Sequence, residues 1–302
     1  KSKKLIGAVN RQISSLWMRN HCPDLMHETY YAAKPLDGPF KGRLLTVYDM
    51  IHEKFPKEFP ANDLMREIKQ IAIARADHIL CISQNTKNDL CELLDVPDER
   101  VSVAHLGFER MHGATPDTLY SRMKKPYLLY VGRRNGYKNF AATLKAVASR
   151  PALQDSFDIV AFGGGPFDPH EKSMIGSLGF DPNSVRQIEG DDQVLGAFYS
   201  DATVLVYPSL YEGFGLPTLE AMAHNCPVVT SNTSSMPEVV GPAGEYFDPT
   251  DIDAQAEAIN RAVFDSERRE ELISEGKRRL DQFSWLQCAT KTCEVYRTLL
   301  CR

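Results

Sequence analysis

Residues 207–223 read YPSLYEGFGLPTLEAMA and join an expected strand to an expected helix. The apolar residues 202–207 have the length of a buried strand, and residues 216–223 are predicted to be helical. Gly213 and Gly215 lie in the turn, and Pro217 falls in the first helical turn, where a missing N–H costs nothing. Such a turn lets a ligand approach the backbone, and free N–H groups at the start of a helix favour an anion.

Two carboxylates bracket this turn. Glu212 opens the loop, and Glu220 lies roughly a turn and a half inside the helix. This layout suits a ligand with a phosphate in the middle and hydroxyls on both sides, such as a nucleotide sugar. The alternative interpretation is a glycine turn with two surface glutamates.

The segment resembles the Glu-x7-Glu signature of retaining GT-B glycosyltransferases, and its residue sequence is similar to that of glycosyltransferase family four. The resemblance extends from YLLYVGRRNGYKN (127–139) to PVVTSNTSSMPEVVGPAGEYFDP (227–249). It is looser in the N-terminal half, in DLMHETYY (24–31), LLTVYDMIHEKFP (44–56) and ADHILCISQNTKNDL (76–90). It implies an α/β protein of GT-B type, with two Rossmann-like, doubly wound domains facing a cleft.

Composition agrees with a soluble two-domain protein. The 302 residues fit two α/β domains, and 43% hydrophobic and 25% charged residues are ordinary values. A net charge of −5 argues mildly against a nucleic-acid partner. Seven cysteines without a CxxC pair indicate buried or incidental thiols in a reducing compartment, so we expect a cytoplasmic location.

Residues 5–19 have apolar side chains at helical spacing, with lysines and arginines around them. A basic amphipathic helix of this kind can lie on an anionic membrane, which predicts peripheral contact with the inner membrane surface. The commoner role of such a helix is to cover a sheet.

The first half of the chain alternates strands and helices, which indicates a parallel sheet. We expect strands at 24–27, 43–48, 77–83 and 101–106, helices at 61–76 and 84–94, and a loop at 49–56. Members of the family normally begin with a strand and a glycine-rich loop. We therefore expect the N-terminal domain, residues 1–115, to be incomplete or unusually short.

The second half is predicted to be a complete doubly wound domain, residues 116–284, after a polar linker at 109–125. Strands are expected at 127–131, 157–162, 184–188, 202–207, 227–230 and 244–247. Helices are expected at 140–149, 169–178, 193–200, 216–223, 236–240, 251–264 and 266–282. Ligands of such a domain lie beyond the carboxyl ends of its strands. The resemblance implies that a last helix, in residues 285–302, returns to the first domain.

Transfer from a nucleotide sugar releases a diphosphate, and the site must stabilise its growing negative charge. The resemblance implies that Arg133 and Lys138 grip this diphosphate, together with Gly132 and backbone N–H groups of Gly213, Phe214, Gly215 and Leu216. A guanidinium can bond two phosphate oxygens, and an ammonium acts as a point charge. No DxD-like pair adjoins this loop, so we predict an enzyme without a metal or other cofactor. A solvated basic loop is the alternative.

The remaining donor contacts are also implied by the resemblance. Glu220 would hold the ribose hydroxyls, because a carboxylate accepts from two adjacent hydroxyls. Glu212 would hold a hydroxyl of the donor sugar and stabilise positive charge on its ring. Gly164 would let the backbone approach the nucleotide, although a tight structural turn explains it equally, and the base would pack near Glu189.

The first domain is expected to supply the acceptor side. Family members often place a histidine directly after the strand at 43–48, but this chain has Tyr48 and Asp49 there. Asp49 and His52 are therefore the candidates to orient the acceptor hydroxyl or take its proton. His27 and Tyr30 lie in a loop at the same sheet edge and are expected to line the acceptor site.

These assignments predict a retaining hexosyltransferase that uses a nucleotide diphosphate sugar and a glycan or lipid-linked acceptor. GDP-mannose is the first choice of donor, and a UDP-sugar remains open. The alternative is a non-catalytic nucleotide-sugar-binding domain or an inactive fragment of a larger synthase. A sugar-nucleotide epimerase or a phosphorylase has a similar shape, but a phosphorylase needs a cofactor lysine motif that we do not find.

Overall fold

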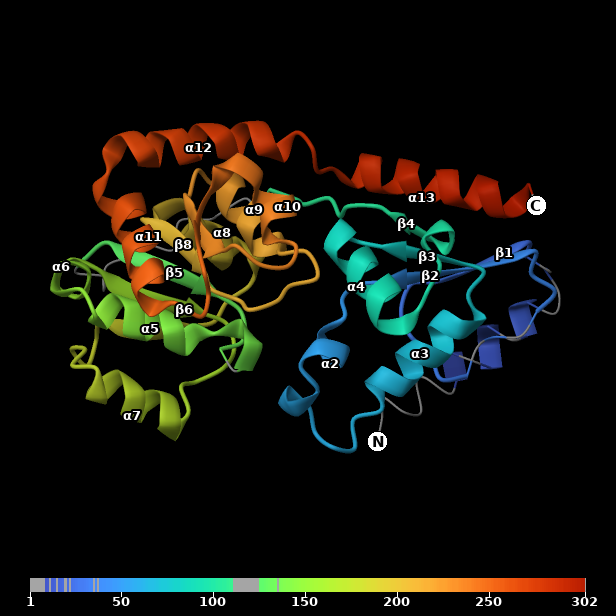
Figure 1. Ribbon diagram of the computed structural model, residues 1–302, viewed down its shortest axis with the longest axis horizontal. Coiled ribbons are helices and arrows are strands. Elements are labelled where there is room, and N and C mark those ends of the chain that lie inside the picture. The colour runs from blue at the N-terminus through green and yellow to red at the C-terminus, as the bar shows by residue number, and fades with distance from the viewer. Residues whose placement is uncertain are drawn as a thin grey trace. The chain divides into compact units, whose positions relative to one another are not determined.

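The computed structural model describes residues 9–10, 12–14, 16–18, 21, 23–34, 36, 38–110, 125–134 and 136–301 (Figure 1). The chain divides into two compact units. One consists of Lys1–His105 and Leu286–Arg302, and the other of Leu106–Trp285. Most of the expected linker at 109–125 lies outside the described residues.

The second unit contains a six-stranded parallel sheet with the order β10-β9-β8-β5-β6-β7. Its strands are β5 (Tyr127–Val131), β6 (Asp158–Phe162), β7 (Val185–Ile188), β8 (Val204–Tyr207), β9 (Val228–Ser231) and β10 (Gly244–Phe247). All six were predicted, with ends shifted by at most two residues. The valine-rich sequences of the inner strands β8 and β9 follow from burial on both faces of a parallel sheet.

Helices cover both faces of this sheet. They are α5 (Phe140–Ala148), α6 (Pro151–Ser156), α7 (Pro169–Ser177), α8 (Asp192–Asp201), α9 (Leu216–Ala223), α10 (Met236–Val240), α11 (Ile252–Phe264) and α12 (Ser266–Leu280). Apolar residues of α5 and α11 share one core with β5, β6 and β8. On the opposite face Phe198 of α8 packs against Phe162 at 5.7 Å. The short helix α6 was not predicted, although Pro151 at its start is a helix signal.

The strand order places a topological switch point between β5 and β8. From β5 the chain winds outward through β6 to β7, and from β8 it winds in the other direction through β9 to β10. Loops at the carboxyl ends of β5 and β8 therefore diverge to opposite sides, which leaves room for a ligand there. This is the doubly wound α/β fold that the sequence predicted.

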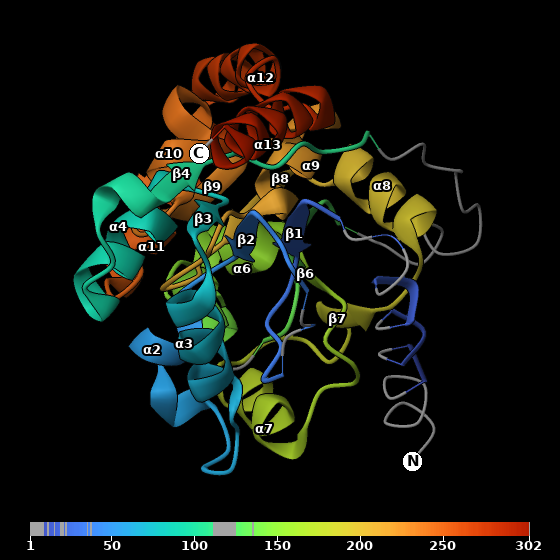
Figure 2. The ribbon, with the colours of Figure 1, turned by 90° about the vertical axis from the view of Figure 1, so that its right-hand side faces the viewer.

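The first unit contains a four-stranded parallel sheet with the order β1-β2-β3-β4. The strands are β1 (Leu25–Glu28), β2 (Gly42–Val47), β3 (His78–Cys81) and β4 (Val101–Val103). The helices α3 (Met65–Arg75) and α13 (Trp285–Leu300) lie on opposite faces of this sheet (Figures 1 and 2). α13 contributes Val295 and Leu299 to a core with Leu44, Leu80 and Ala104. α4 (Gln84–Leu94) has the predicted bounds.

Several expectations for the first unit were wrong. His27 lies within β1 and not in a loop, and the strand expected at 101–106 ends at Val103. Residues 49–56 were predicted to be a loop, but Ile51–Lys54 form the short helix α2, and Pro56–Glu58 form a 3-10 turn. The Asp49 carboxylate accepts a hydrogen bond from the backbone N–H of Ile51 at 3.0 Å, in a local turn around Met50, the N-cap residue, which makes no side-chain cap itself. Such a local side-chain turn is difficult to foresee in a segment of mixed polarity.

The described residues between 9 and 21 are helical, but most of their apolar side chains are exposed. Val9, Ile13, Leu16 and Trp17 are 45 to 60% exposed, whereas Met18 is 6% exposed. Within the described residues, this segment therefore does not cover a sheet with its apolar stripe. Among the helices in the described part of the chain, none is long and apolar enough to cross a membrane.

Candidate functional site

The candidate site of the second unit is formed by the loops after β5, β6, β7 and β8. The loop after β5 begins at Gly132, whose φ is +127°, and ends in a 3-10 turn at Gly136–Lys138. The buried Tyr130 stabilises this loop, because its hydroxyl donates to the carbonyl of Arg133 and lies 3.3 Å from that of Lys138. A side chain of β5 thus holds the two ends of this loop in place.

Lys138 and Glu212 form an ion pair across the switch point. Nζ of Lys138 lies 2.6 Å from Oε1 of Glu212, and their side chains are 18% and 9% exposed. The Tyr207 hydroxyl also bonds to Glu212. Burial and the nearby Glu212 charge raise the pKa of Tyr207 well above its usual value, so this phenol stays protonated. The predicted cation and carboxylate are therefore brought together in a mostly buried place.

A row of hydroxyls at the end of β9 positions the loop that carries Glu212. Ser235 donates to the carbonyls of Glu212 and Phe214 at 2.9 and 3.0 Å. The Ser234 hydroxyl accepts from the backbone N–H of Glu212 at 3.0 Å. Since Ser235 is fully buried, these bonds replace water and fix the loop. Three further hydroxyls donate to carbonyls of the same loop, those of Thr230, Ser231 and Thr233.

Gly215 sets the direction of α9. Its φ of +99° is a region that side chains rarely adopt, and a Cβ there would lie 2.3 Å from Cε of Met236. The carbonyl of Gly215 accepts from the Thr218 hydroxyl at 2.8 Å. Pro217 falls in the first turn, as predicted. Pro217 has no N–H, and the N–H of Thr218 bonds to the Gly215 carbonyl at 3.0 Å, so an anion would meet the backbone at the very start of α9, around Leu216.

Glu220 lies on α9 and faces α8. Its Oε2 accepts a hydrogen bond from the hydroxyl of Tyr199 at 2.9 Å. Burial raises the pKa of Glu220, and the bond from Tyr199 partly opposes this effect. Glu212 and Glu220 therefore occupy the two ends of the segment 212–220, each held by a buried tyrosine.

The two adjacent arginines have different surroundings. Arg133 is exposed, and within the residues that the structure describes its side chain has no hydrogen bond or ion pair. Arg134 is 9% exposed and pairs with Glu171 of α7 at 2.7 Å. It also donates to the carbonyls of Gly163 and Gly165, each at 2.8 Å. Arg133 is thus available to a ligand, whereas Arg134 supports the fold.

The loop after β6 contains Gly163, Gly164 and Gly165, all with φ between +74° and +84°. A Cβ at Gly164 would lie 2.7 Å from a guanidinium nitrogen of Arg134. Gly164 thus lets the backbone approach that arginine. This contact agrees with the second of the two roles that the sequence allowed for Gly164, a tight structural turn. Glu189, after β7, is exposed.

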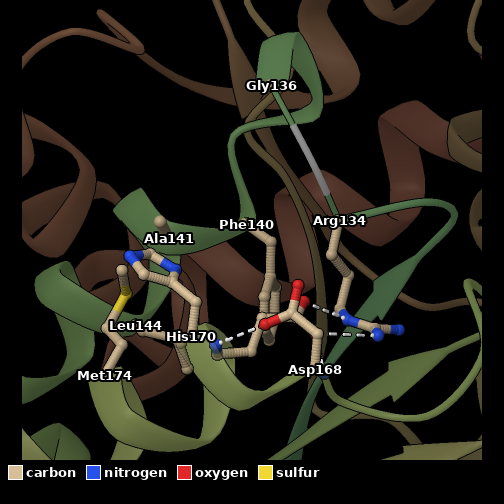
Figure 3. A pocket seen from close by; sticks show the side chains of 9 residues that line it. Arg134, Gly136, Phe140, Ala141, Leu144, Asp168, His170 and Met174 are labelled. Carbon is tan, nitrogen blue, oxygen red and sulfur yellow. Dashed lines mark hydrogen bonds and ion pairs between the residues drawn. The ribbon is translucent and has the colours of Figure 1, made fainter.

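A pocket of about 260 Å³ lies between α5 and α7. Figure 3 shows Arg134 and Asp168 at one end of it and Leu144 and Met174 at the other. Asp168 caps α7 by accepting from the backbone N–H of Glu171 at 2.8 Å. The polar groups at this end are thus bonded to one another.

In the first unit, Tyr30, Tyr48 and Asp49 lie together after β1 and β2. The ring of Tyr30 is 6.1 Å from that of Tyr48. Beside them is Lys69, which is fully buried and bonds to the Asp49 carbonyl at 2.9 Å and to the Glu53 carboxylate at 2.7 Å. Asp49 Oδ1 lies 3.7 Å from the same ammonium. Asp49 is therefore held near a fixed positive charge.

The two predicted histidines are not part of that cluster. His27 hydrogen-bonds to Tyr296 of α13 at 2.7 Å and to Thr46 at 2.8 Å, so both ring nitrogens are occupied. Burial lowers its pKa. His52 stacks on Phe59 with ring centroids 3.9 Å apart and lies 4.0 Å from Asp63.

Sequence reasoning missed several residues that hold these groups. Tyr199 and Tyr207 support the two glutamates, Arg134 supports the glycine turn, and Lys69 bonds to the backbone of Asp49 and lies 3.7 Å from its carboxylate. Tyrosines and lysines in helices and strands have no pattern that distinguishes such roles. Arg134 offered one signal, because a second arginine beside a ligand-binding one is a candidate for bracing the loop.

Comparison with known proteins identifies the family. Residues 116–279 match the model of the glycosyl transferases group 1. The O-antigen chain mannosyltransferase B of Escherichia coli is 32% identical over 269 residues, which cover 85% of this chain and 71% of that protein. The O-antigen chain mannosyltransferase RfbU of Salmonella typhimurium is 27% identical over 220 residues, 72% of this chain and 60% of that protein.

Solved structures show the same fold. Sucrose-phosphate synthase from Thermosynechococcus elongatus has a TM-score of 0.77 at 22% identity, covering 96% of this chain and 77% of that one. WaaG, a glycosyltransferase involved in lipopolysaccharide biosynthesis, has a TM-score of 0.71 at 17% identity, with 93% and 80% covered. The chain therefore belongs to the glycosyl transferases group 1 family and has the GT-B fold.

Proposed function

We propose that this protein transfers a hexose, with mannose as the first choice, from a nucleotide diphosphate sugar to a glycan or lipid-linked acceptor. The observation that carries this proposal is the Lys138–Glu212 pair at the switch point, 2.6 Å long and mostly buried. It places a cation for the diphosphate beside a carboxylate for the sugar. Arg133, which has no side-chain partner among the described residues, and the start of α9 adjoin the same loops.

The diphosphate is bound by cations and N–H groups in this proposal. Arg133 and Lys138 neutralise the charge that grows as the glycosidic bond breaks, and Gly132 and the backbone of 213–216 lie close to the phosphates. Because two side-chain cations and a helix start serve this purpose, the reaction needs no metal ion.

The two glutamates bind the two sugars of the donor. Glu220 accepts hydrogen bonds from the ribose, and Glu212 accepts one from the hexose and stabilises positive charge on its ring. Gly164 and Glu189 belong to the loops beyond β6 and β7, where the base packs. The mannosyltransferase relatives favour GDP-mannose, and a UDP-sugar is the alternative donor.

In this proposal the N-terminal domain, residues 1–115, binds the acceptor. Asp49 has the best support as the residue that orients the acceptor hydroxyl, because Lys69 keeps its charge in place. Tyr30 and Tyr48 offer aromatic surfaces for a glycan. His52 is a second candidate for this role, and His27 serves by holding β1 to α13. The donor domain is 116–284, followed by the helix in 285–302.

The transfer retains the configuration of the hexose. The bond between C1 and the phosphate oxygen breaks, and C1 bonds to the acceptor oxygen on the same face. Because the acceptor oxygen attacks C1 directly, no enzyme nucleophile takes part, and the acceptor proton passes to the departing phosphate.

We also place the protein at the cytoplasmic face of a membrane. Five basic residues and no acidic residue precede Asp24, and the apolar side chains of Ile13, Leu16 and Trp17 are exposed. This combination fits an anionic lipid surface.

The test is a thermal-shift screen against GDP, UDP, ADP and their sugar conjugates, with and without EDTA. A ligand that binds the native state raises the melting temperature by mass action. A shift with one nucleotide family, unchanged by EDTA, supports the proposal, and transfer to an acceptor must follow. Binding without transfer would favour a non-catalytic nucleotide-sugar binder. No shift with any of them contradicts the proposed donor site.

A further inference from the structure

Tyr199 is the residue through which α8 reaches the candidate donor site. It has no exposed surface, and its ring lies 5.8 Å from that of His224 and is stacked on it. Its hydroxyl donates to Oε2 of Glu220 at 2.9 Å. Burial and the nearby Glu220 charge raise the pKa of this phenol well above its usual value, so it acts as a donor throughout the neutral range.

This bond leaves the two oxygens of Glu220 in different states. Oε2 is tied to a rigid, buried donor, whereas Oε1 has no partner among the described residues. A second contact orients the same turn of α9, because Nδ1 of His224 hydrogen-bonds to the Glu220 carbonyl at 2.8 Å. The plane of the carboxylate is thereby set before any ligand arrives.

We propose that Tyr199 is a positioning residue, which holds the Glu220 carboxylate in the plane needed to accept from the 2′- and 3′-hydroxyls of a ribose. This inference rests on the proposed donor site. An acceptor fixed in advance loses less conformational entropy when it binds a diol. The gain in affinity that Tyr199 gives therefore requires both ribose hydroxyls. The site then selects a ribonucleotide over a deoxyribonucleotide.

The charge on Glu220 gives a second signature. Besides burial and Tyr199, the groups that act on its pKa are Asp192 of α8, which raises it, and His224, which lowers it. Removal of the Tyr199 hydroxyl takes away a donor that favours the charged form, so the pKa of Glu220 rises further. Affinity for a diol should then begin to fall at a higher pH than in the wild type.

The experiment compares the wild type with Tyr199→Phe by calorimetric titration. The probes are the nucleotide sugar identified by thermal shift and its 2′-deoxy and 2′,3′-dideoxy analogues. A nucleotide sugar is used because its diphosphate diester does not titrate near neutral pH. The matched control is Tyr127→Phe, which also deletes a buried phenol hydroxyl, one that donates to the Phe198 carbonyl at 2.8 Å.

The expected result is a rise in Kd of about three- to tenfold for the ribonucleotide in Tyr199→Phe, with no change for the dideoxy analogue. When the pH is lowered, the affinity of Tyr199→Phe should begin to fall at a higher pH than that of the wild type. Tyr127→Phe should bind like the wild type. In a Glu220→Ala background the Tyr199 substitution should have no further effect.

The following results would overturn the inference or the proposed function on which it rests. If the wild type binds the nucleotide sugar and Tyr199→Phe weakens the ribose and dideoxy forms equally, Tyr199 serves the fold and does not position Glu220. If Tyr199→Phe fails to fold, Tyr199→His keeps a ring and a donor, and equal loss for both analogues again means that Tyr199 serves the fold. If the wild type binds none of these nucleotides, the proposed function itself falls.

Discussion

The ammonium of Lys138 lies 2.6 Å from a carboxylate oxygen of Glu212, although these residues belong to loops after different strands. Without a ligand, each neutralises the other in a place that is mostly closed to water. A diphosphate that enters beside Lys138 would share its charge, because the ammonium has three donors and Glu212 uses one of them. The pair therefore keeps the cation oriented without blocking it.

This arrangement predicts that Lys138→Ala lowers kcat more than it weakens donor binding. Charge on the diphosphate grows during the reaction, so the lost attraction is larger in the transition state. We expect kcat to fall by about a hundredfold or more, and donor affinity by about tenfold. Steady-state kinetics and calorimetric titration measure the two effects.

The control for this substitution is Lys145→Ala on α5, an exposed lysine of the same unit. It should leave both quantities unchanged. Equal losses of kcat and affinity in Lys138→Ala would mean that the lysine binds substrate and transition state alike, against the role proposed for it.

Substitutions of Arg133 and Arg134 should have different effects, the first mainly on nucleotide affinity and the second mainly on the free energy of unfolding. Arg134→Met removes the bonds to Glu171, Gly163 and Gly165, so the free energy of unfolding should fall by about 2–4 kcal/mol. Arg133→Met changes an exposed side chain and should alter it by about 0.5 kcal/mol or less. Urea titration measures stability, and nucleotide titration should show the reverse order, with the larger loss of affinity in Arg133→Met. The same stability loss in both variants would contradict this division.

The conformation of Gly215 leads to a prediction about the loop itself. Gly215→Ala should destabilise the protein by about 1–3 kcal/mol, because φ is +99° and the new Cβ would collide with Met236. The control is Gly176→Ala in α7, where a Cβ meets nothing within 4 Å. That substitution should stabilise the protein by about 0.5–1 kcal/mol through helix propensity. Thermal unfolding distinguishes the two, and a neutral Gly215→Ala would show that the turn can relax.

The sequence predicted the second sheet and the bounds of α9 because strands buried on both faces and a glycine–proline turn leave strong local patterns. It also predicted Lys138 and Glu212 as site residues, through the motif that contains them. It did not predict Tyr199, which meets Glu220 from 21 residues away, or the burial of Lys69 beside Asp49. Such partners depend on the packing of separate elements, about which a local pattern carries no information.

The exposed apolar side chains near the N-terminus predict binding to lipid. The protein should sediment with vesicles that contain phosphatidylglycerol and much less with pure phosphatidylcholine, because anionic lipid attracts the basic residues of this segment. Ile13→Asp with Leu16→Asp should abolish sedimentation. Leu64→Asp, at an equally exposed residue just before α3, is the control. Equal binding by all three proteins would exclude this segment as the contact.

Glu220 should reveal the cost of a buried charge through the pH dependence of stability. Burial raises its pKa above the usual value of a glutamate. The charged carboxylate is therefore less favourable in the folded protein than in the unfolded chain, which lowers the free energy of unfolding at neutral pH. Glu220→Gln keeps an acceptor for Tyr199 and removes that charge. It should therefore raise the melting temperature at about pH 7 while it weakens ribonucleotide binding.

The sign of this effect follows from linkage. A carboxyl group whose pKa is raised on folding contributes stability that is fully present below the unfolded pKa and is lost as the pH rises through the folded value. The wild type should thus regain stability as the pH falls through the folded pKa of Glu220 toward its unfolded value, and the advantage of Glu220→Gln should shrink over that interval. Glu189→Gln, which removes an exposed charge from the same sheet edge, is the control and should show no such trend. An advantage of Glu220→Gln that stays constant as the pH is lowered to the unfolded pKa of a glutamate would mean that Glu220 is not a destabilised charge, and that its bond from Tyr199 already offsets its burial.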